Sequence, residues 1–173
     1  MIFGSVIRAS VMSIATPTLP FLVGHPAHFI ALGGGAGLSP LMPGTVGTMV
    51  ALPIAWLLFA HVGTVGWLIA LALVTIIGAW SASITGRNLG AADHGAIVID
   101  EIAAFLLVVF LVGADPLRQA IAFVVFRFFD IVKPPPIRQV DAAWKNGAGV
   151  MADDFIAAFY TLIVMAIGQR LLA

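Results

Sequence analysis

Two pairs of adjacent carboxylates stand near the expected starts of apolar helices: Asp100 with Glu101, and Asp153 with Asp154. An acid beside hydrocarbon costs about 3 kcal/mol, so these acids need compensation from a metal ion or from mutual pairing. Carboxylate oxygens are the hard ligands that Mg²⁺ prefers, which makes the four residues candidate magnesium ligands. The alternative is structural, because acids in the first turn of a helix are stabilised by unpaired backbone N–H groups and by the helix dipole.

A second group of charged residues surrounds a run of three prolines, with Arg127, Asp130 and Lys133 before it and Arg138 after it. Spacings of three residues put the first three on one side of a helix, where they can neutralise one another. The prolines end that helix and form a rigid segment that orients Lys133 and Arg138. Arg138 has the planar fork that suits phosphate, and Lys133 is a compact point charge. We therefore predict either mutual pairing or phosphate binding by these cations.

Asp93 and His94 precede Gly95 in an expected turn. One interpretation makes Asp93 a helix N-cap and leaves His94 in solvent. The other makes His94 a proton donor or acceptor, because its ordinary pKa is near neutrality, with Asp93 as its orienting partner or as a further metal ligand. The other histidines, His25, His28 and His61, have no carboxylate nearby in the sequence, and we expect them to be structural or interfacial.

The stretch 35–48 combines glycines and two prolines with the hydroxyls of Ser39, Thr45 and Thr48, just before an apolar run. A helix start of this kind offers backbone and hydroxyl donors to a phosphate. It is not a P-loop, because no lysine follows the glycines, and it is not a dinucleotide motif, because no strand precedes it. Taken alone, the stretch is a weak signal, and a plain turn and helix cap is the better interpretation.

The chain that positions these groups is unusually apolar: 61% of its 173 residues are hydrophobic and 9% are charged, with a mean hydropathy of +1.11. So little polar surface cannot cover a soluble globule, and we predict a membrane protein. Eight basic and eight acidic residues cancel, so no basic stripe is available for nucleic acid. The absence of cysteine excludes disulfides, thiolate zinc sites and thiol catalysis.

Five apolar runs predict five helices, over 45–62, 64–84, 97–113, 117–132 and 154–172. The second is long enough to cross a bilayer, whereas the third and fourth carry charges and are less certain to cross. Pro53 either kinks the first run or marks its beginning. Residues 1–32 predict a short interfacial or extra helix. The expected fold is an all-α integral membrane bundle of about five core helices plus a short N-terminal helix, in a single domain over 1–173 with its core in 33–158.

Alternating these five segments across a bilayer gathers most charges at one face. That face receives seven of the eight acids, together with Arg87, Arg127, Lys133, Arg138 and Lys145, whereas the opposite face receives Asp115, Arg118 and Arg170. Because lysine and arginine accumulate on the cytoplasmic side of membrane proteins, we predict that the crowded face is cytoplasmic.

Four ordered blocks resemble the bacterial phosphatidylglycerophosphatase A family. They are Gly-Leu-Ser-Pro at 37–40 with Pro-Gly-Thr-Val-Gly-Thr at 43–48, Asp-His-Gly-Ala-Ile-Val-Ile-Asp-Glu at 93–101, Arg-Phe-Phe-Asp-Ile-Val-Lys-Pro-Pro-Pro-Ile-Arg at 127–138, and Gly-Ala-Gly-Val-Met-Ala-Asp-Asp at 147–154. The resemblance runs from about residue 35 to residue 158, and its blocks coincide with the crowded face.

The resemblance implies a helical, Mg²⁺-dependent phosphatase of the bacterial inner membrane, with its active site facing the cytoplasm. Its substrate would be phosphatidylglycerophosphate held in bilayer lipid, and its products phosphatidylglycerol and phosphate. The expected catalytic residues are Asp93, His94, Asp100, Glu101, Asp130, Lys133, Arg138 and Asp154. The expected phosphate-binding residues are Ser39, Thr45, Thr48, Arg127, Lys133 and Arg138, and the expected metal ligands are Asp100, Glu101, Asp153 and Asp154.

Two alternatives stay open at this stage. The nucleophile is either an activated water or an aspartate that forms an aspartyl phosphate. A different class of protein, a small transporter or channel, would use intramembrane acids to relay protons or bind cations, and it predicts charges spread through the membrane depth.

Overall fold

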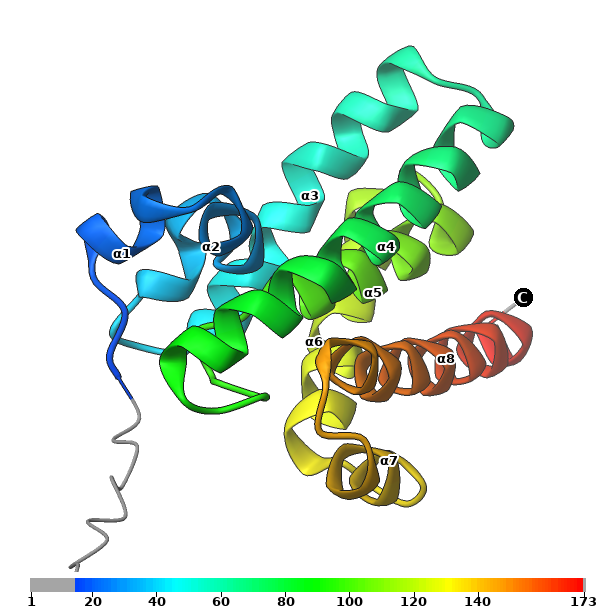
Figure 1. Cartoon of the computed structure of the whole chain (residues 1–173). Helices are drawn as coiled ribbons and strands as arrows, with labels where there is room; N and C mark the ends of the chain where they lie inside the picture. The colour runs from blue at the N-terminus through cyan, green and yellow to red at the C-terminus, as the bar shows by residue number, and fades with distance from the viewer. Residues whose placement is uncertain (1–14, 173) are drawn as a thin grey trace, which may run out of the picture.

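The structure is a computed structural model that describes residues 15–172, and within that range it contains helices and connections but no strand (Figure 1). The helices are α1 Leu19–Gly24, α2 Pro26–Ala31, the 3₁₀ helix η1 Gly33–Leu38, α3 Pro43–His61, α4 Thr64–Leu89, α5 Ile99–Val112, α6 Pro116–Val132, α7 Ile137–Ala143 and α8 Gly147–Leu172. The five predicted core helices correspond to α3, α4, α5, α6 and α8. The predicted all-α bundle is therefore confirmed.

The centre of the bundle is α5, with α3, α4, α6 and α8 packed around it. Its sequence after Glu101 is apolar on every side, which is the pattern of a helix buried in a core. Fourteen residues at 1.5 Å each make it about 21 Å long, shorter than the ~30 Å of bilayer hydrocarbon. It is therefore a core helix, which accounts for the charges that the sequence places inside this segment.

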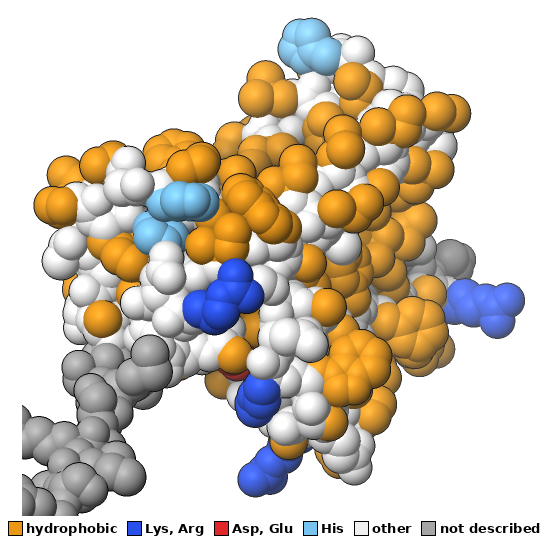
Figure 2. All heavy atoms as spheres, in the orientation of Figure 1, with side chains coloured by type: hydrophobic (Ala, Val, Ile, Leu, Met, Phe, Trp, Pro, Cys, Tyr) orange, Lys and Arg blue, Asp and Glu red, His pale blue; other side chains and the backbone are white. Residues whose placement is uncertain are grey.

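Within residues 15–172, three helices are long and apolar enough to cross a membrane: α3, α4 and α8. They carry large exposed apolar side chains, including Trp56 and Leu57 on α3 and Ile76 on α4. In Figure 2 hydrophobic side chains cover the upper part of the visible face, over α3 and α4, while most of the visible Lys and Arg side chains lie below them. Asp and Glu barely show on this face. Pro53 lies inside α3, so it does not mark the beginning of that helix.

The last helix begins at Gly147, seven residues before the predicted start at 154. At Gly147 the glycine is needed for packing, since an added Cβ would meet the carbonyl oxygen of Ala79 and the hydroxyl of Ser83 on α4. Asn146 caps the helix, because its side-chain Oδ1 accepts a hydrogen bond of 2.9 Å from the N–H of Gly149.

The N-terminal part folds as two short helices, where the sequence predicted one; α2 packs beside α4, and α1 packs against α2. The ring of His28 is buried, stacks on Phe21, donates from Nδ1 to the carbonyl of Phe21 at 2.9 Å and accepts from the amide of Asn88 on α4 at 2.9 Å. His25 caps α2 by accepting from the N–H of Ala27. The structural roles predicted for these two histidines are confirmed, while the part of the prediction that falls on residues 1–14 lies outside the described range.

Candidate active site

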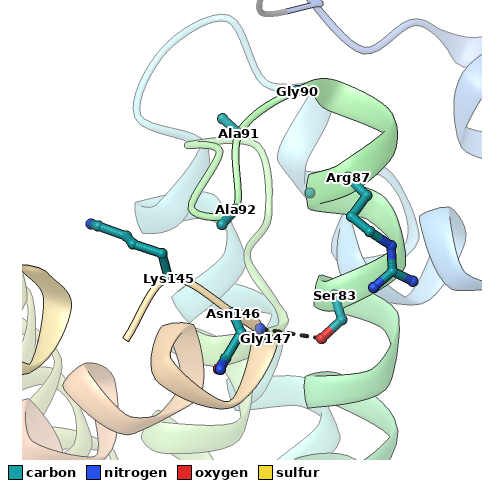
Figure 3. A pocket seen from close by; sticks show the side chains of 9 residues that line it. Ser83, Arg87, Gly90, Ala91, Ala92, Lys145, Asn146 and Gly147 are labelled. Carbon is teal, nitrogen blue, oxygen red and sulfur yellow. Dashed lines mark hydrogen bonds between the residues drawn. The ribbon is translucent and has the colours of Figure 1, made fainter. Parts of the chain in front are cut away.

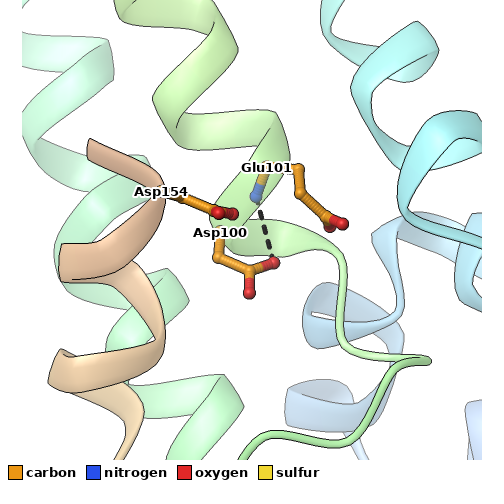
Figure 4. Close-up of side chains that lie close together, drawn as sticks. All are labelled: Asp100, Glu101 and Asp154. Atoms are coloured by element: carbon orange, nitrogen blue, oxygen red, sulfur yellow. Dashed lines mark hydrogen bonds between the residues drawn. The ribbon is translucent and has the colours of Figure 1, made fainter. Parts of the chain in front are cut away.

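Three carboxylates from two helices converge at one end of the bundle. Asp100 and Glu101 lie in the first turn of α5, and Asp154 on α8 points toward that turn (Figure 4). One oxygen from each of the three lies within 4.8 Å of the other two. Asp100 and Asp154 are 6% and 4% exposed, so the convergence takes place in the protein interior.

The start of α5 is fixed by neighbouring elements. The N–H of Val98, which precedes the helix, donates to the carbonyl of Ala31 on α2 at 2.9 Å. Within the first turn, the N–H of Glu101 donates to Oδ1 of Asp100 at 3.0 Å. The predicted position of this acid pair at a helix start is confirmed, and the positive end of the helix dipole favours carboxylates there.

The second acid pair does not cap a helix. Since α8 begins at Gly147, Asp153 and Asp154 lie about two turns inside it, and its first turn contains no acid. The capping interpretation is therefore wrong for these residues. Both are buried, and a carboxylate is costly there unless a cation or hydrogen-bond donors compensate it.

The electrostatics of this cluster favour an added positive charge, because its carboxylates are buried and repel one another. Burial, followed by the adjacent Glu101 carboxylate, raises the pKa of Asp100 well above its usual value. Burial, followed by Asp130, raises the pKa of Glu101 to about 7, although Arg127 opposes the shift. Oε2 of Glu101 and Oδ2 of Asp154 are buried without a hydrogen-bond partner in the described part of the chain. Closely spaced, unsatisfied carboxylate oxygens fit a hard divalent cation.

Cations surround the cluster as ion-pair partners. Arg127 on α6 lies 2.6 Å from Oδ2 of Asp130 and 3.3 Å from Oε1 of Glu101. Lys133 follows the last turn of α6 in a left-handed conformation, with φ of 46°, and its Nζ lies 2.6 Å from Oδ2 of Asp153. The predicted pairing of Arg127 with Asp130 is confirmed, and Lys133 brings positive charge to the second acid pair.

Replacing Lys133 with glutamine should lower both activity and stability. It removes an ion pair to a buried carboxylate, and a hydrogen bond to a charged group contributes about 2 kcal/mol. Thermal unfolding of the purified protein in detergent measures the change, with Arg170→Gln at the other end of α8 as a control. An unchanged unfolding temperature would show that the pair contributes nothing to the fold.

The glycine and hydroxyl stretch contributes to the site through its second half. Thr48 on α3 is buried, donates to the carbonyl of Gly44 at 2.9 Å and accepts from Nη1 of Arg127 at 3.4 Å. Oγ1 of Thr45 is also buried and lacks a hydrogen-bond partner among the described residues. Ser39 is different, because its hydroxyl donates to the carbonyl of Leu41 at an exposed position.

Gly44 is a site residue that the sequence reasoning did not single out. A Cβ at this position would clash with Oε1 of Glu101 and lie 3.0 Å from Nη1 of Arg127. The backbone of α3 therefore approaches the carboxylate as closely as a glycine allows. The only available signal was its place inside the Pro-Gly-Thr-Val-Gly-Thr block.

The remaining predicted residues lie around this centre. Asp93 does not cap α5, whose N-cap is Val98, so that interpretation is wrong. Asp93 instead lies near enough to Asp100 to contribute to the rise in the pKa of Asp100. Nδ1 of His94 accepts from the N–H of Ala96 at 3.1 Å, which leaves the proton of the neutral ring on Nε2. Arg138 is exposed on α7, and its role stays a prediction.

Comparison with known proteins decides the family. The family model described as Phosphatidylglycerophosphatase A matches residues 29–169, which includes every residue of the site. The chain belongs to the phosphatidylglycerophosphatase A family. The predicted resemblance is confirmed, and the match extends beyond the predicted range at both ends.

Named relatives agree with this assignment. The chain is 37% identical to phosphatidylglycerophosphatase A of Haemophilus influenzae over 82% of this chain and 87% of the relative, and 37% identical to that of Escherichia coli over 77% of each. It is also 32% identical, over 87% of its length and 94% of the relative, to a Bacteroides thetaiotaomicron protein named as a candidate phosphatidylinositol-3-phosphatase. No solved structure matches the chain.

The predicted enzyme class, a phosphatase, is thereby confirmed. The acids of the site also gather at one end of the bundle, where the transporter or channel alternative expected charges spread through the membrane depth. Family and geometry together favour the hydrolase over that alternative.

Proposed function

We propose that this chain is a Mg²⁺-dependent phosphatidylglycerophosphatase that removes the terminal phosphate of phosphatidylglycerophosphate and leaves phosphatidylglycerol. The observation that carries the proposal is the convergence of Asp100, Glu101 and Asp154 in a chain of this family. Two relatives bear the name of this activity over most of their length. The membrane character of α3, α4 and α8 is consistent with a lipid substrate.

The three converging carboxylates are the residues that would hold the cation, with Asp153 beside them in contact with Lys133. A divalent cation, when bound, supplies positive charge for phosphoryl oxygens and makes a water more acidic. Lys133 and Arg127 add positive charge next to the carboxylates and can neutralise the remaining phosphate oxygens.

His94 is a proposed hydrogen-bond donor to the substrate. Because Nδ1 accepts from the N–H of Ala96, the neutral ring carries its proton on Nε2, which can donate a hydrogen bond to a phosphate oxygen. Asp93, next to it, is the proposed orienting partner or a further ligand. Thr45 is the proposed hydroxyl donor from α3, since its buried Oγ1 has no hydrogen-bond partner in the described chain.

Removing the metal should abolish the reaction. Purified protein is incubated with phosphatidylglycerophosphate in mixed micelles, and phosphate release is measured with Mg²⁺, with EDTA, and with Mg²⁺ restored after EDTA. We expect release with Mg²⁺, loss of at least about a hundredfold with EDTA, and recovery on restoration. Undiminished release in EDTA would rule out the metal-dependent mechanism, and absence of release under all three conditions would rule out the proposed substrate.

We also propose that the protein lies in the bacterial inner membrane as one domain, with its active site at the cytoplasmic side. The support is the location of Arg127 and Lys133 at the same end of the bundle as the acid cluster, because cytoplasmic ends are rich in such residues. Single cysteines introduced at the exposed positions Ala142 and Val65, near opposite ends of the bundle, test this orientation by labelling from either side of intact spheroplasts.

A further inference from the structure

A pocket near the acid cluster has two cations and no acid among the described residues that line it. Its volume is about 500 Å³, within the range of small-ligand sites, and it lies between the end of α4, the connection after it and the start of α8. Among the described residues that line it, the charged ones are Arg87 and Lys145, both cations. Figure 3 shows them on opposite sides of the pocket, with Ala91 and Ala92 on the connection between them.

The pocket and the acid cluster lie on one face of α8. Gly147 lines the pocket, and Asp154 belongs to the cluster. Seven residues separate them, which is two turns of helix, so they share a face about 10 Å apart along the axis. The side chain of Asp154 leans back toward the helix start, which shortens the separation between its oxygens and the pocket.

The connection from α4 to α5 also joins the two places. Ala92 lines the pocket, and the next residue, Asp93, is close enough to Asp100 to affect its ionisation. Gly86 permits this path, because a Cβ there would lie 2.8 Å from the carbonyl oxygens of Ala91 and Ala92. The chain therefore leads from a cationic pocket to an acidic centre within a few residues.

The proposed substrate has two phosphate groups whose separation is of the same order as the distance between the pocket and the acid cluster. Its headgroup carries a phosphodiester, then a glycerol, then the terminal phosphate that is removed. Six single bonds join the two phosphorus atoms, which gives a reach of about 7 Å, as for two extended residues of a backbone. The anionic phosphodiester needs cations, whereas the terminal phosphate needs the acid cluster with its metal.

We propose that the pocket lined by Arg87 and Lys145 binds the phosphodiester of the lipid headgroup and so selects a substrate with two phosphate groups. This inference rests on the proposed function. In the structure both side chains are exposed and extend outward from the pocket, and other rotamers of these long side chains would place their charged ends over its mouth. Both are positioning and specificity residues, because the reacting phosphate lies at the other site.

The test compares two lipids that differ in this phosphodiester. Phosphatidylglycerophosphate has it, whereas phosphatidic acid presents a terminal phosphate alone. Phosphate release is measured for both at equal mole fraction in micelles, with the full chain and with R87Q, K145Q and the double variant. We expect the ratio of kcat/KM for the two lipids to fall about tenfold or more in the double variant, through KM for the first lipid.

Matched variants separate a loss of substrate preference from a general effect of positive charge on binding anionic lipid. The double variant R118Q/R170Q removes two cations elsewhere in the bundle and should keep the wild-type ratio. The exchange R87K/K145R keeps both charges and should retain most of the preference. An equal loss of activity toward both lipids in R87Q/K145Q would show that the cations only attract anionic lipid, and it would overturn the assignment, as would an unchanged ratio.

Inhibition by inorganic phosphate tests whether the pocket binds free phosphate instead of the phosphodiester of the lipid. If the pocket binds free phosphate instead, R87Q/K145Q will weaken inhibition by phosphate and leave the lipid ratio unchanged, which overturns the assignment to the phosphodiester. Wild-type protein that releases phosphate from neither lipid would overturn the proposed function and this inference together. A wild type that is active on both with equal kcat/KM would overturn this inference alone.

Discussion

Replacing Asp154 with asparagine is expected to reduce phosphate release by about a thousandfold. Asp154 is the only member of the converging trio that comes from α8, and its Oδ2 has no hydrogen-bond partner in the described structure. Asparagine keeps the shape but replaces one ligand oxygen with an N–H donor and removes a negative charge. The loss of several kcal/mol of charge stabilisation in the transition state corresponds to a rate effect of this size.

Stability should move differently from activity in this variant. A buried carboxylate near other carboxylates destabilises the fold in the absence of metal, so Asp154→Asn should keep or raise the unfolding temperature measured in EDTA. Asp115→Asn is the matched control, because Asp115 caps α6 away from the cluster and asparagine caps equally well. Wild-type rates in Asp154→Asn would show that the carboxylate cluster is not the reaction centre.

Replacing Gly44 with alanine should reduce activity by about a hundredfold through a single added methyl group. In most helices this change is stabilising by about 0.5–1 kcal/mol, because glycine loses more conformational entropy on folding. Here the new Cβ overlaps Oε1 of Glu101 and crowds the guanidinium of Arg127. The carboxylate has to leave its position, and displacement of about 1 Å at a reaction centre can cost a hundredfold in rate.

The control for this variant is Gly168→Ala. Gly168 lies inside α8 with nothing within 4 Å of the position that a Cβ would take. It should therefore gain the ordinary stability of alanine in a helix and keep wild-type activity. If Gly44→Ala matches Gly168→Ala in both steady-state activity and unfolding temperature, then the close approach of α3 to Glu101 has no functional role.

The location of the site could be predicted from the sequence because charge is scarce in this chain. In an apolar protein, acids near hydrocarbon are tolerated only where something compensates them, so their order along the helices already indicates a common end of the bundle. The contact of Glu101 with Arg127 and that of Lys133 with Asp153 confirm that gathering. Periodicity and length were enough for the five core helices.

The predictions that failed concern details that depend on contacts between helices, and a local sequence pattern does not reveal such contacts. Gly147 belongs to a helix because it packs against Ala79 and Ser83, although glycine alone favours a turn. That shift of seven residues moved Asp153 and Asp154 from a helix end into a helix interior and removed their capping role. The closeness of Gly44 to Glu101 and the pocket beside Arg87 likewise arise only when α3, α4, α5 and α8 are assembled.

The position of the acid cluster along α8 has a consequence for how lipid and water reach the proposed reaction centre. The acidic first turn of α5 faces the third turn of α8, so the reaction centre sits about 10 Å below the rim formed by the start of that helix. On the proposed function, the lipid can stay anchored by its tails during the whole turnover. Water is then the reactant that has to diffuse, from the aqueous phase to a phosphate that stays attached to a lipid in the bilayer.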